Sequence, residues 1–263
     1  MIVKQAENVV LLLQFFAARQ KPATLAEVSQ HFGWPRSSTY NLLSTLASHG
    51  FLYETRERRG FYPTPLWLDL ATTISEADPL PDKLTRIADR LATESGETVW
   101  LSLASGMFRL SVYVQESRQQ VRVSARVGDR IPIHAAASGH ALMSQMSPAE
   151  VEQILRKADY RAYAENTPTS REAVLQQIEE GRQRGWFLSA ANYSNGLGGV
   201  AAPVIENGRC MAITIAGPVF RIDNELPRFA AMIHEALAHE YGPEHSQETL
   251  RDMRLPGSKR RHS

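Results

Sequence analysis

Residues 23–52, ATLAEVSQHFGWPRSSTYNLLSTLASHGFL, constrain the fold more than any other part of the chain. Their pattern predicts a helix, a turn at Gly33-Trp34-Pro35, and a second helix that begins near Pro35, whose missing N–H costs nothing there. Gly50 suits the end of that second helix, and Phe51-Leu52-Tyr53 begins a strand. In this order the features predict a winged helix-turn-helix, and with it DNA binding.

Two groups of side chains are candidates for contact with DNA. The start of the second helix is polar, and its side chains and free N–H groups suit base edges and phosphates. The wing tip carries three arginines suited to phosphate or minor-groove contact. For any single residue, a helix cap or a solvated turn is an equally good interpretation. The candidates are Arg36, Ser37, Ser38, Thr39, Tyr40 and Asn41 in the helix, with Tyr40 also assigned to its apolar stripe, and Arg56, Arg58 and Arg59 in the wing.

Composition sets broad limits. With 263 residues, 43% of them hydrophobic and 22% charged, the chain is long enough for two soluble domains. The sequence contains no run of 18 apolar residues, so no membrane-spanning helix is expected. The early segment VVLLLQFFAA is interpreted as an amphipathic helix, since charges and Gln14 interrupt it, and no signal-peptide cleavage site follows. The single cysteine, Cys210, excludes an internal disulfide and fits a cytoplasmic protein.

Charge is unevenly distributed along the chain. Residues 1–64 carry seven Lys or Arg against four Asp or Glu, whereas residues 65–253 carry 18 against 24. A basic start and an acidic body suit one module that meets phosphate and a second with another role. This charge difference is small enough to be ordinary variation between segments. It therefore gives only weak support to the DNA binding that the helix-turn-helix pattern predicts.

The remaining segments predict a second domain of mixed structure. A change from helical period to period two near residue 97, and the return to helices near 137, predict an α+β domain with an antiparallel sheet. The expected domains are a winged helix-turn-helix at 1–64, a linker helix at 65–81, a sensor domain at 82–245 and a basic, disordered tail at 246–263. The expected helices are 4–19, 65–78, 82–96, 137–146, 148–158, 170–185 and 223–241, and the expected strands of the second domain are Thr98–Ala104, Arg109–Glu116, Val121–Val127, Trp186–Tyr193, Gly199–Glu206 and Arg209–Val219.

One stretch of the second domain suggests a ligand site. In VGDRIPIHAAASGHALM, residues 127–143, a strand leads through a turn into a helix that opens with small residues. Small side chains let a ligand approach the backbone, and the free N–H groups of the helix start suit a carboxylate. Close packing of the helix on the sheet explains the small residues equally well.

Together these segments resemble the IclR family of bacterial transcriptional regulators over nearly the whole chain. Ser38-Thr39 and Leu42-Leu43-Ser44-Thr45-Leu46 stand in the familiar places, and the longest matches are VGDRIPIHAAASGHAL (127–142) and NGLGGVAAPVIENGRCMAITIAGPVFRI (195–222). The resemblance implies a GAF-like effector-binding domain behind the winged helix-turn-helix. It also implies a homodimer, which can pair into a tetramer.

The resemblance also implies where an effector would bind. The implied contacts come from the start of the helix after the Ile-Pro-Ile strand, the Gly-rich segment and alternate positions on the next strand. These are Ala137, Ser138, Leu197, Gly199, Thr214 and Ala216, to which the chain's own pattern adds Trp100 and Tyr113 as apolar or aromatic walls.

Four positions depart from the family pattern. Asn41 stands where many members have arginine, so the operator preference of those members is not carried over to this chain. Ala191-Asn192 replaces an acidic pair, and Gly199 replaces a common cysteine. These changes lead to the hypothesis of a roomier, less negatively charged pocket for a larger or aromatic effector.

Two other classes of function stay open beside the ligand-responsive regulator of a pseudo-palindromic operator. One is a nucleoid-type DNA-binding protein whose second domain only oligomerises. The other is a DNA-tethered enzyme acting on a small carboxylate. Asp129, His134 and Ser138 are triad residue types, but no G-x-S-x-G elbow is present. The histidine spacings do not match two ligands on one helix face, so neither a metal nor another cofactor is expected.

Overall fold

The protein is described by a computed structural model for residues 3–55 and 60–242. The chain divides into two compact units between Pro79 and Leu80. The expected basic tail, 246–263, lies outside the described residues.

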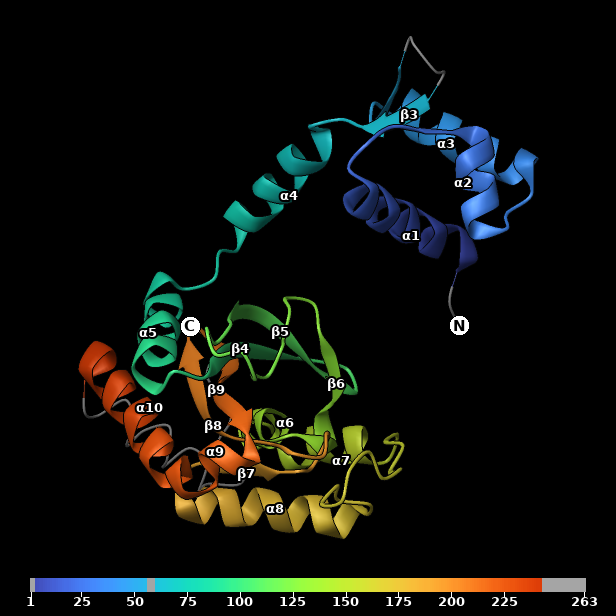
Figure 1. Ribbon diagram of the computed structural model, residues 1–263. Helices are drawn as coiled ribbons and strands as arrows, with labels where there is room; N and C mark the ends of the chain where they lie inside the picture. The colour runs from blue at the N-terminus through green and yellow to red at the C-terminus, as the bar shows by residue number, and fades with distance from the viewer. Residues whose placement is uncertain (1–2, 56–59, 243–263) are drawn as a thin grey trace. The chain divides into compact units, whose positions relative to one another are not determined.

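The N-terminal unit is a helical core with a small sheet (Figure 1). Thr24 begins the second helix with a capping box, accepting from the Glu27 N–H while the Glu27 carboxylate accepts from the Thr24 N–H. Gly33 ends that helix with φ 66°, a left-handed conformation that favours glycine. The elements are α1 (Lys4–Arg19), β1 (Ala23–Thr24), α2 (Leu25–Phe32), α3 (Arg36–Ser48), β2 (Leu52–Glu54), β3 (Gly60–Pro63) and α4 (Leu66–Ala77), with the strands in the order β1-β3-β2.

The apolar segment near the N-terminus is part of α1. It buries Leu12 and Phe16 in the core of this unit, against Val28 of α2 and Leu43 of α3. No helix in the described part of the chain is long and apolar enough to span a membrane. The pairing of β1 with β3 was not predicted, because a two-residue strand carries no periodicity of its own.

The linker helix α4 follows the wing hairpin directly. Its start is held by Trp67, whose indole N–H donates to the Phe51 carbonyl at 3.0 Å. None of its residues is buried, and Leu68 and Ile74 are each more than 70% exposed.

The C-terminal unit is built on a six-stranded antiparallel sheet in the order β6-β5-β4-β9-β8-β7 (Figure 1). Its strands are β4 (Thr98–Ser105), β5 (Phe108–Gln115), β6 (Arg130–Pro132), β7 (Phe187–Ala190), β8 (Leu197–Glu206) and β9 (Arg209–Pro218). Its helices are α5 (Asp82–Ser95), α6 (Ala137–Met143), α7 (Pro148–Leu155), α8 (Arg171–Arg184), α9 (Val219–Ile222) and α10 (Leu226–Tyr241), with 3₁₀ turns at Ile133–Ala135 and Asp223–Glu225.

Helices cover both faces of the sheet. Along β9, Met211, Ile213 and Ile215 pack with α5 and α10 on one face. The alternate residue Ala212 packs with α6, α7 and α8 on the other. This alternation follows from the period of two in a strand. The fold is therefore an α+β domain with an antiparallel sheet, as predicted.

The predicted third strand, Val121–Val127, is wrong. Those residues form no strand, and the edge of β5 pairs instead with β6. The loop is held mainly by side chains: Thr98 donates to the Val123 carbonyl at 2.6 Å, and the Ala125 N–H donates to the Glu116 carboxylate at 3.1 Å. These bonds take the place of a strand ladder. Alternation in the sequence could not distinguish a loop held in this way from a strand.

Candidate functional site

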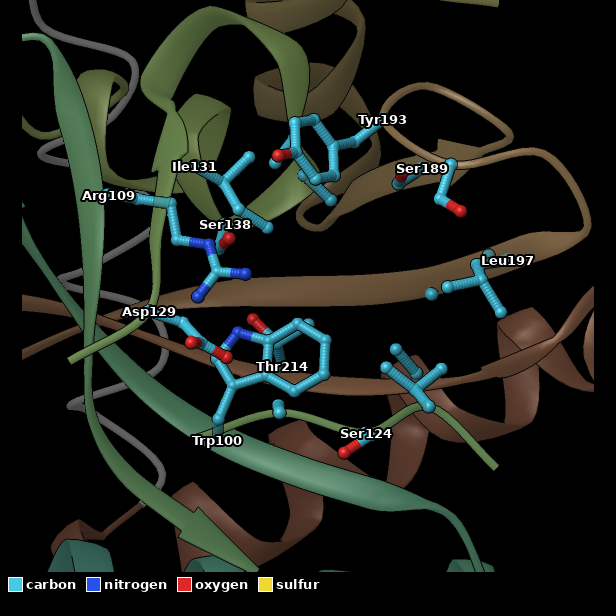
Figure 2. A pocket seen from close by; sticks show the side chains of 18 of the residues that line it. Trp100, Arg109, Ser124, Asp129, Ile131, Ser138, Ser189, Tyr193, Leu197 and Thr214 are labelled. Atoms are coloured by element: carbon cyan, nitrogen blue, oxygen red, sulfur yellow. The ribbon is translucent and has the colours of Figure 1, made fainter. Parts of the chain in front are cut away.

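A cavity of about 380 Å³ lies on the α6 side of the sheet, bounded by the 123–131 segment, the start of α6 and the 189–197 segment (Figure 2). Seven of the eight residues predicted to contact an effector line it: Trp100, Ala137, Ser138, Leu197, Gly199, Thr214 and Ala216. Its volume lies at the small end of the usual range for ligand pockets, about 300–1,000 Å³.

Tyr113, the eighth, was assigned to the wrong face. It lies opposite Leu101 in the β4–β5 pairing and shares the face that packs on α5. Its phenol donates to Asp89 Oδ1 on α5 at 2.7 Å. Burial and Asp89 together raise the pKa of Tyr113 to about 12, so the hydroxyl stays a donor.

A register shift between Leu101 and Ser102 separates Tyr113 from the cavity. Beyond the shift, Ser102 pairs with Ser111 and Ala104 pairs with Arg109, so one residue of β5 is left out of the ladder. Such a β-bulge exchanges the two faces of a strand. Arg109 and Ser111 therefore share the face of Trp100.

Arg109 is the unexpected residue of the site. Its side chain is 3% exposed, and the guanidinium turns into the cavity beside Asp129, Ser138 and Trp100 (Figure 2). It donates to the Ser111 hydroxyl, and its guanidinium carbon lies 5.2 Å from the centre of the Trp100 ring. Burial lowers the pKa of Arg109 to about 10, against the opposing effect of Asp129, so the group is still charged at neutral pH.

Three buried polar atoms at this end of the cavity have no hydrogen-bond partner among the described residues. They are Arg109 Nε, Trp100 Nε1 and Thr214 Oγ1. Trp100 and Thr214 are direct partners in the β4–β9 pairing, which brings two of these atoms together. Buried polar groups normally have partners, so these three atoms are available to a group bound in the cavity.

The rest of the cavity is mainly apolar. Trp100 packs with Val123, Ala125 and Ala216, and Leu197 lies against this cluster. An apolar wall combined with a limited number of polar groups is typical of a small-molecule site.

Glycine contributes to the site through close packing. A Cβ at Gly199 would lie 2.6 Å from the Ile215 carbonyl oxygen, and one at Gly139 would lie 1.7 Å from the Ile133 carbonyl oxygen. The close-packing interpretation of the small residues in α6 is thus supported at Gly139.

Ala191 and Asn192 do not line the cavity, because Asn192 turns its amide to the Ala190 N–H and to Gln177. The hypothesis of reduced negative charge in the pocket therefore loses this support.

The sequence analysis missed several lining residues. The unexpected polar ones are Arg109, Ser124, Asp129, Arg130, Ser189, Tyr193 and Ser194. Arg109 could have been identified as a charged residue inside the otherwise mainly apolar strand FRLSVYV. The others lie in segments without periodicity, so only the tertiary structure brings them together.

The three triad residue types do not form a triad. No hydrogen bond joins Asp129, His134 and Ser138 in the part of the chain that the structure describes; Asp129 instead accepts from the Arg126 N–H at 2.7 Å. His134 packs against the Tyr160 ring, and the fully buried His140 donates from Nε2 to the His134 carbonyl at 2.7 Å. Burial lowers the pKa of His140 to about 4, so it is neutral at physiological pH.

In the N-terminal unit, α3 exposes most of the predicted DNA-contacting side chains. Arg36, Ser37, Ser38 and Asn41 are exposed, and so is Tyr40 at 56%, which removes it from the apolar stripe. Thr45 and Ser48, which the sequence analysis did not select, are exposed farther along α3.

Thr39 was wrongly placed on the outer face. It is fully buried, and its hydroxyl donates to the Pro35 carbonyl at 3.0 Å. It therefore holds the first turn of α3 and cannot reach a ligand outside. The three wing arginines, Arg56, Arg58 and Arg59, lie outside the described residues.

Two family profiles match the chain. One, described as the IclR helix-turn-helix domain, matches residues 5–56, and the other, the C-terminal domain of the bacterial transcriptional regulator IclR, matches residues 73–239. The chain is 27% identical over 230 residues to the transcriptional repressor IclR of Escherichia coli, covering 86% of this chain and 84% of that one. It is 27% identical over 246 residues to the regulator KdgR of the same organism, covering 89% and 92%.

Solved structures share the fold. The IclR protein of Thermotoga maritima has a TM-score of 0.72 at 18% identity, over 95% of this chain and 97% of that one. An IclR homologue from Microbacterium hydrocarbonoxydans, complexed with 4-hydroxybenzoate, has a TM-score of 0.71 at 20% identity, over 95% and 99%. With both profiles matched in order, and the second covering more than half of the residues, the chain belongs to the IclR family of bacterial transcriptional regulators.

Proposed function

We propose that this regulator senses a small organic carboxylate in the cavity of its C-terminal unit and changes its affinity for an operator in response. The observation that carries the proposal is the buried guanidinium of Arg109. None of the ion pairs in the described residues includes it. A buried cation that makes no ion pair is costly even with Asp129 nearby, and an anionic ligand would relieve that cost.

The chemistry of the cavity supports an acid with an apolar body. Trp100, Val123 and Leu197 offer an apolar wall, and the unpartnered donors lie at one end. The structurally similar homologue that binds 4-hydroxybenzoate, an aromatic acid, supports the same class for this chain.

For the output, we propose that α3 enters the major groove and that Arg36, Ser37, Ser38, Tyr40 and Asn41 face the DNA, with the wing arginines on the backbone. A homodimer, or a pair of such dimers, would present two copies of α3 to a pseudo-palindromic operator in the cytoplasm. The linker helix α4 would transmit the effect of the ligand. Such coupling is typically about 1–3 kcal/mol.

The test is a thermal-shift screen of small organic acids on the full chain, followed by operator binding with each hit. The operator is first selected from random duplexes with the purified protein. The proposal expects at least one acid that raises the melting temperature and changes operator affinity about 5- to 150-fold. Acids that bind without any effect on DNA would contradict the regulatory part of the proposal.

The same experiment separates the two rival functions. A nucleoid-type protein would select no preferred duplex and would bind no acid saturably. A DNA-tethered enzyme would convert the acid that it binds, which chromatography of the incubated ligand would detect.

A further inference from the structure

We propose that Arg109 is the anchor of the ligand, and that the ligand is a monocarboxylate whose anionic end accepts from the free donors of Arg109 and Trp100 while its apolar body points toward Leu197. This inference rests on the proposed function and deepens it. It assigns the acid recognition to one side chain of β5 rather than to the N–H groups at the start of α6.

The polar atoms around Arg109 favour an anion over a neutral polar group. Arg109 Nε and Trp100 Nε1 can only donate, and both lack a partner among the described residues. Thr214 Oγ1 beside them can donate or accept. Two fixed donors and one adaptable hydroxyl match a carboxylate, which only accepts, and hydrogen bonds to charged groups are the stronger kind.

The position of Arg109 on the sheet makes it a rigid anchor. Its backbone lies in the β4–β5 ladder, its side chain donates to the buried Ser111 hydroxyl, and its guanidinium stacks over Trp100. A side chain held at three points loses little further freedom on binding. Burial also removes the screening that weakens exposed charges.

Neighbouring charges favour one negative charge over two. Asp129 also lines the cavity near the guanidinium, and its negative charge raises the pKa of Arg109 against the effect of burial. Arg130 lines the cavity as well, but it is exposed and stacks on Phe108, with 4.3 Å from its guanidinium carbon to the ring centre. A second carboxylate on the ligand would therefore be repelled by Asp129, and among the described residues no second buried cation lines the cavity to offset that repulsion.

The far side of the cavity offers apolar contacts for the body of the ligand, with Ser124 and Ser189 also in its lining. Val123, Ala125 and Ala216 cluster with the Trp100 ring, and Leu197 packs against them. Figure 2 shows Leu197 at the opposite side of the cavity from Arg109. A planar or branched hydrocarbon group would replace water there.

The experiment compares acids with their neutral amides by calorimetry on the full chain. The probes are benzoate, 4-hydroxybenzoate, phenylacetate and hexanoate, with the corresponding amides, and the dianion terephthalate. The variants are Arg109→Met and Arg109→Lys. The matched control is Arg126→Met, because Arg126 is exposed on the neighbouring segment and does not line the cavity.

We expect the wild type to prefer an acid to its amide and to bind terephthalate more weakly than benzoate. Arg109→Met should weaken acid binding about 10- to 100-fold, because it removes a hydrogen bond to a charged group. Binding of the amides should change by less than about threefold, as should all binding by the Arg126→Met control. Arg109→Lys should keep part of the preference for the acid, since it keeps the charge but loses the planar fork.

The outcomes separate this inference from the proposed function. If the wild type binds none of the acids, the proposed function fails and the inference fails with it. If the wild type binds an acid but Arg109→Met and Arg109→Lys keep the full acid-to-amide ratio, only the assignment to Arg109 fails, and the α6 N–H groups become the anchor. If Arg109→Met does not fold, the ratio measured for Arg109→Lys decides, because an unchanged ratio there overturns the assignment.

Discussion

Arg109 and Trp100 come from adjacent strands, and the guanidinium carbon of Arg109 lies 5.2 Å from the centre of the Trp100 ring. Both side chains are more than 90% buried, and each has a nitrogen without a partner among the described residues. The pair exists because a bulge in β5 turns Arg109 to the face of Trp100. One irregularity in the ladder thus brings a buried guanidinium to the cavity.

Asn41→Ala should weaken binding to the selected operator about 5- to 100-fold, because a lost base contact is typically worth about 1–3 kcal/mol. Asn41 is exposed on α3, so its removal should leave the melting temperature nearly unchanged. Fluorescence anisotropy with labelled duplexes measures the affinity. The control is Thr39→Val, which removes a buried hydroxyl bonded to Pro35 and should lower stability instead. A larger loss of affinity for Thr39→Val than for Asn41→Ala, at temperatures where both are folded, would contradict this assignment.

Tyr113→Phe should lower the free energy of unfolding by about 1 kcal/mol, because it removes the 2.7 Å hydrogen bond to Asp89. It should not change the affinity for any acid found in the screen, since Tyr113 lies on the α5 face. Trp100→Phe is the comparison: it keeps an apolar ring in the cavity but removes the indole N–H, and it should weaken acid binding. Urea unfolding and calorimetry measure the two quantities. If Tyr113→Phe weakened acid binding as much as Trp100→Phe does, the assignment of Tyr113 to the α5 face would be contradicted.

The stability of the C-terminal unit should fall on acidification because of His140. Its pKa is about 4 in the folded chain against 6.5 for the unperturbed group. Between those values the unfolded chain binds a proton that the folded chain does not, so stability rises with pH across this window. From pH 7.5 to pH 5 the expected loss from this group is about 2 kcal/mol, and His134, whose pKa is also lowered by burial, acts in the same direction.

The measurement is urea unfolding of the full chain at the two pH values. His140→Gln can still donate to the His134 carbonyl but does not titrate, so it should flatten much of the pH dependence. His239→Gln, whose side chain is 72% exposed in the same unit, is the control and should retain the dependence of the wild type. A wild-type slope that survives His140→Gln unchanged would assign the acid sensitivity elsewhere.

The Glu97–Arg221 ion pair should respond unequally to loss of its two partners. Glu97 is 3% exposed and Arg221 is 29% exposed, and one of the bonds between them measures 2.8 Å. Arg221→Met leaves a buried carboxylate without its cation, so it should cost about 3–5 kcal/mol. Glu97→Gln leaves an arginine that can reach water and should cost less, about 1–3 kcal/mol. Thermal unfolding checks the order; a greater loss for Glu97→Gln would contradict it.

The sequence alone determined the N-terminal unit and the general class of the second. The helix-turn-helix rests on signals that act within a few residues, such as the capping box at Thr24 and the left-handed turn at Gly33, so its elements matched the prediction closely. Period-two patterning and apolar runs likewise identified β4, β5, β8 and β9, because strands covered on both faces are apolar along most of their length. The cavity-lining residues that were predicted correctly lie in or at the start of such regular elements.

The side chains that line the cavity depend on contacts between segments that are distant in the sequence. Strict alternation cannot reveal the bulge after Leu101, which depends on pairing between strands and sends Tyr113 to one face and Arg109 to the other. It also cannot show that the 121–127 segment is held by side chains of distant residues, or that Thr39 turns inward to bond Pro35. Periodicity records which residues could share a face, whereas the partners that satisfy their polar groups are set by contacts between segments far apart in the chain.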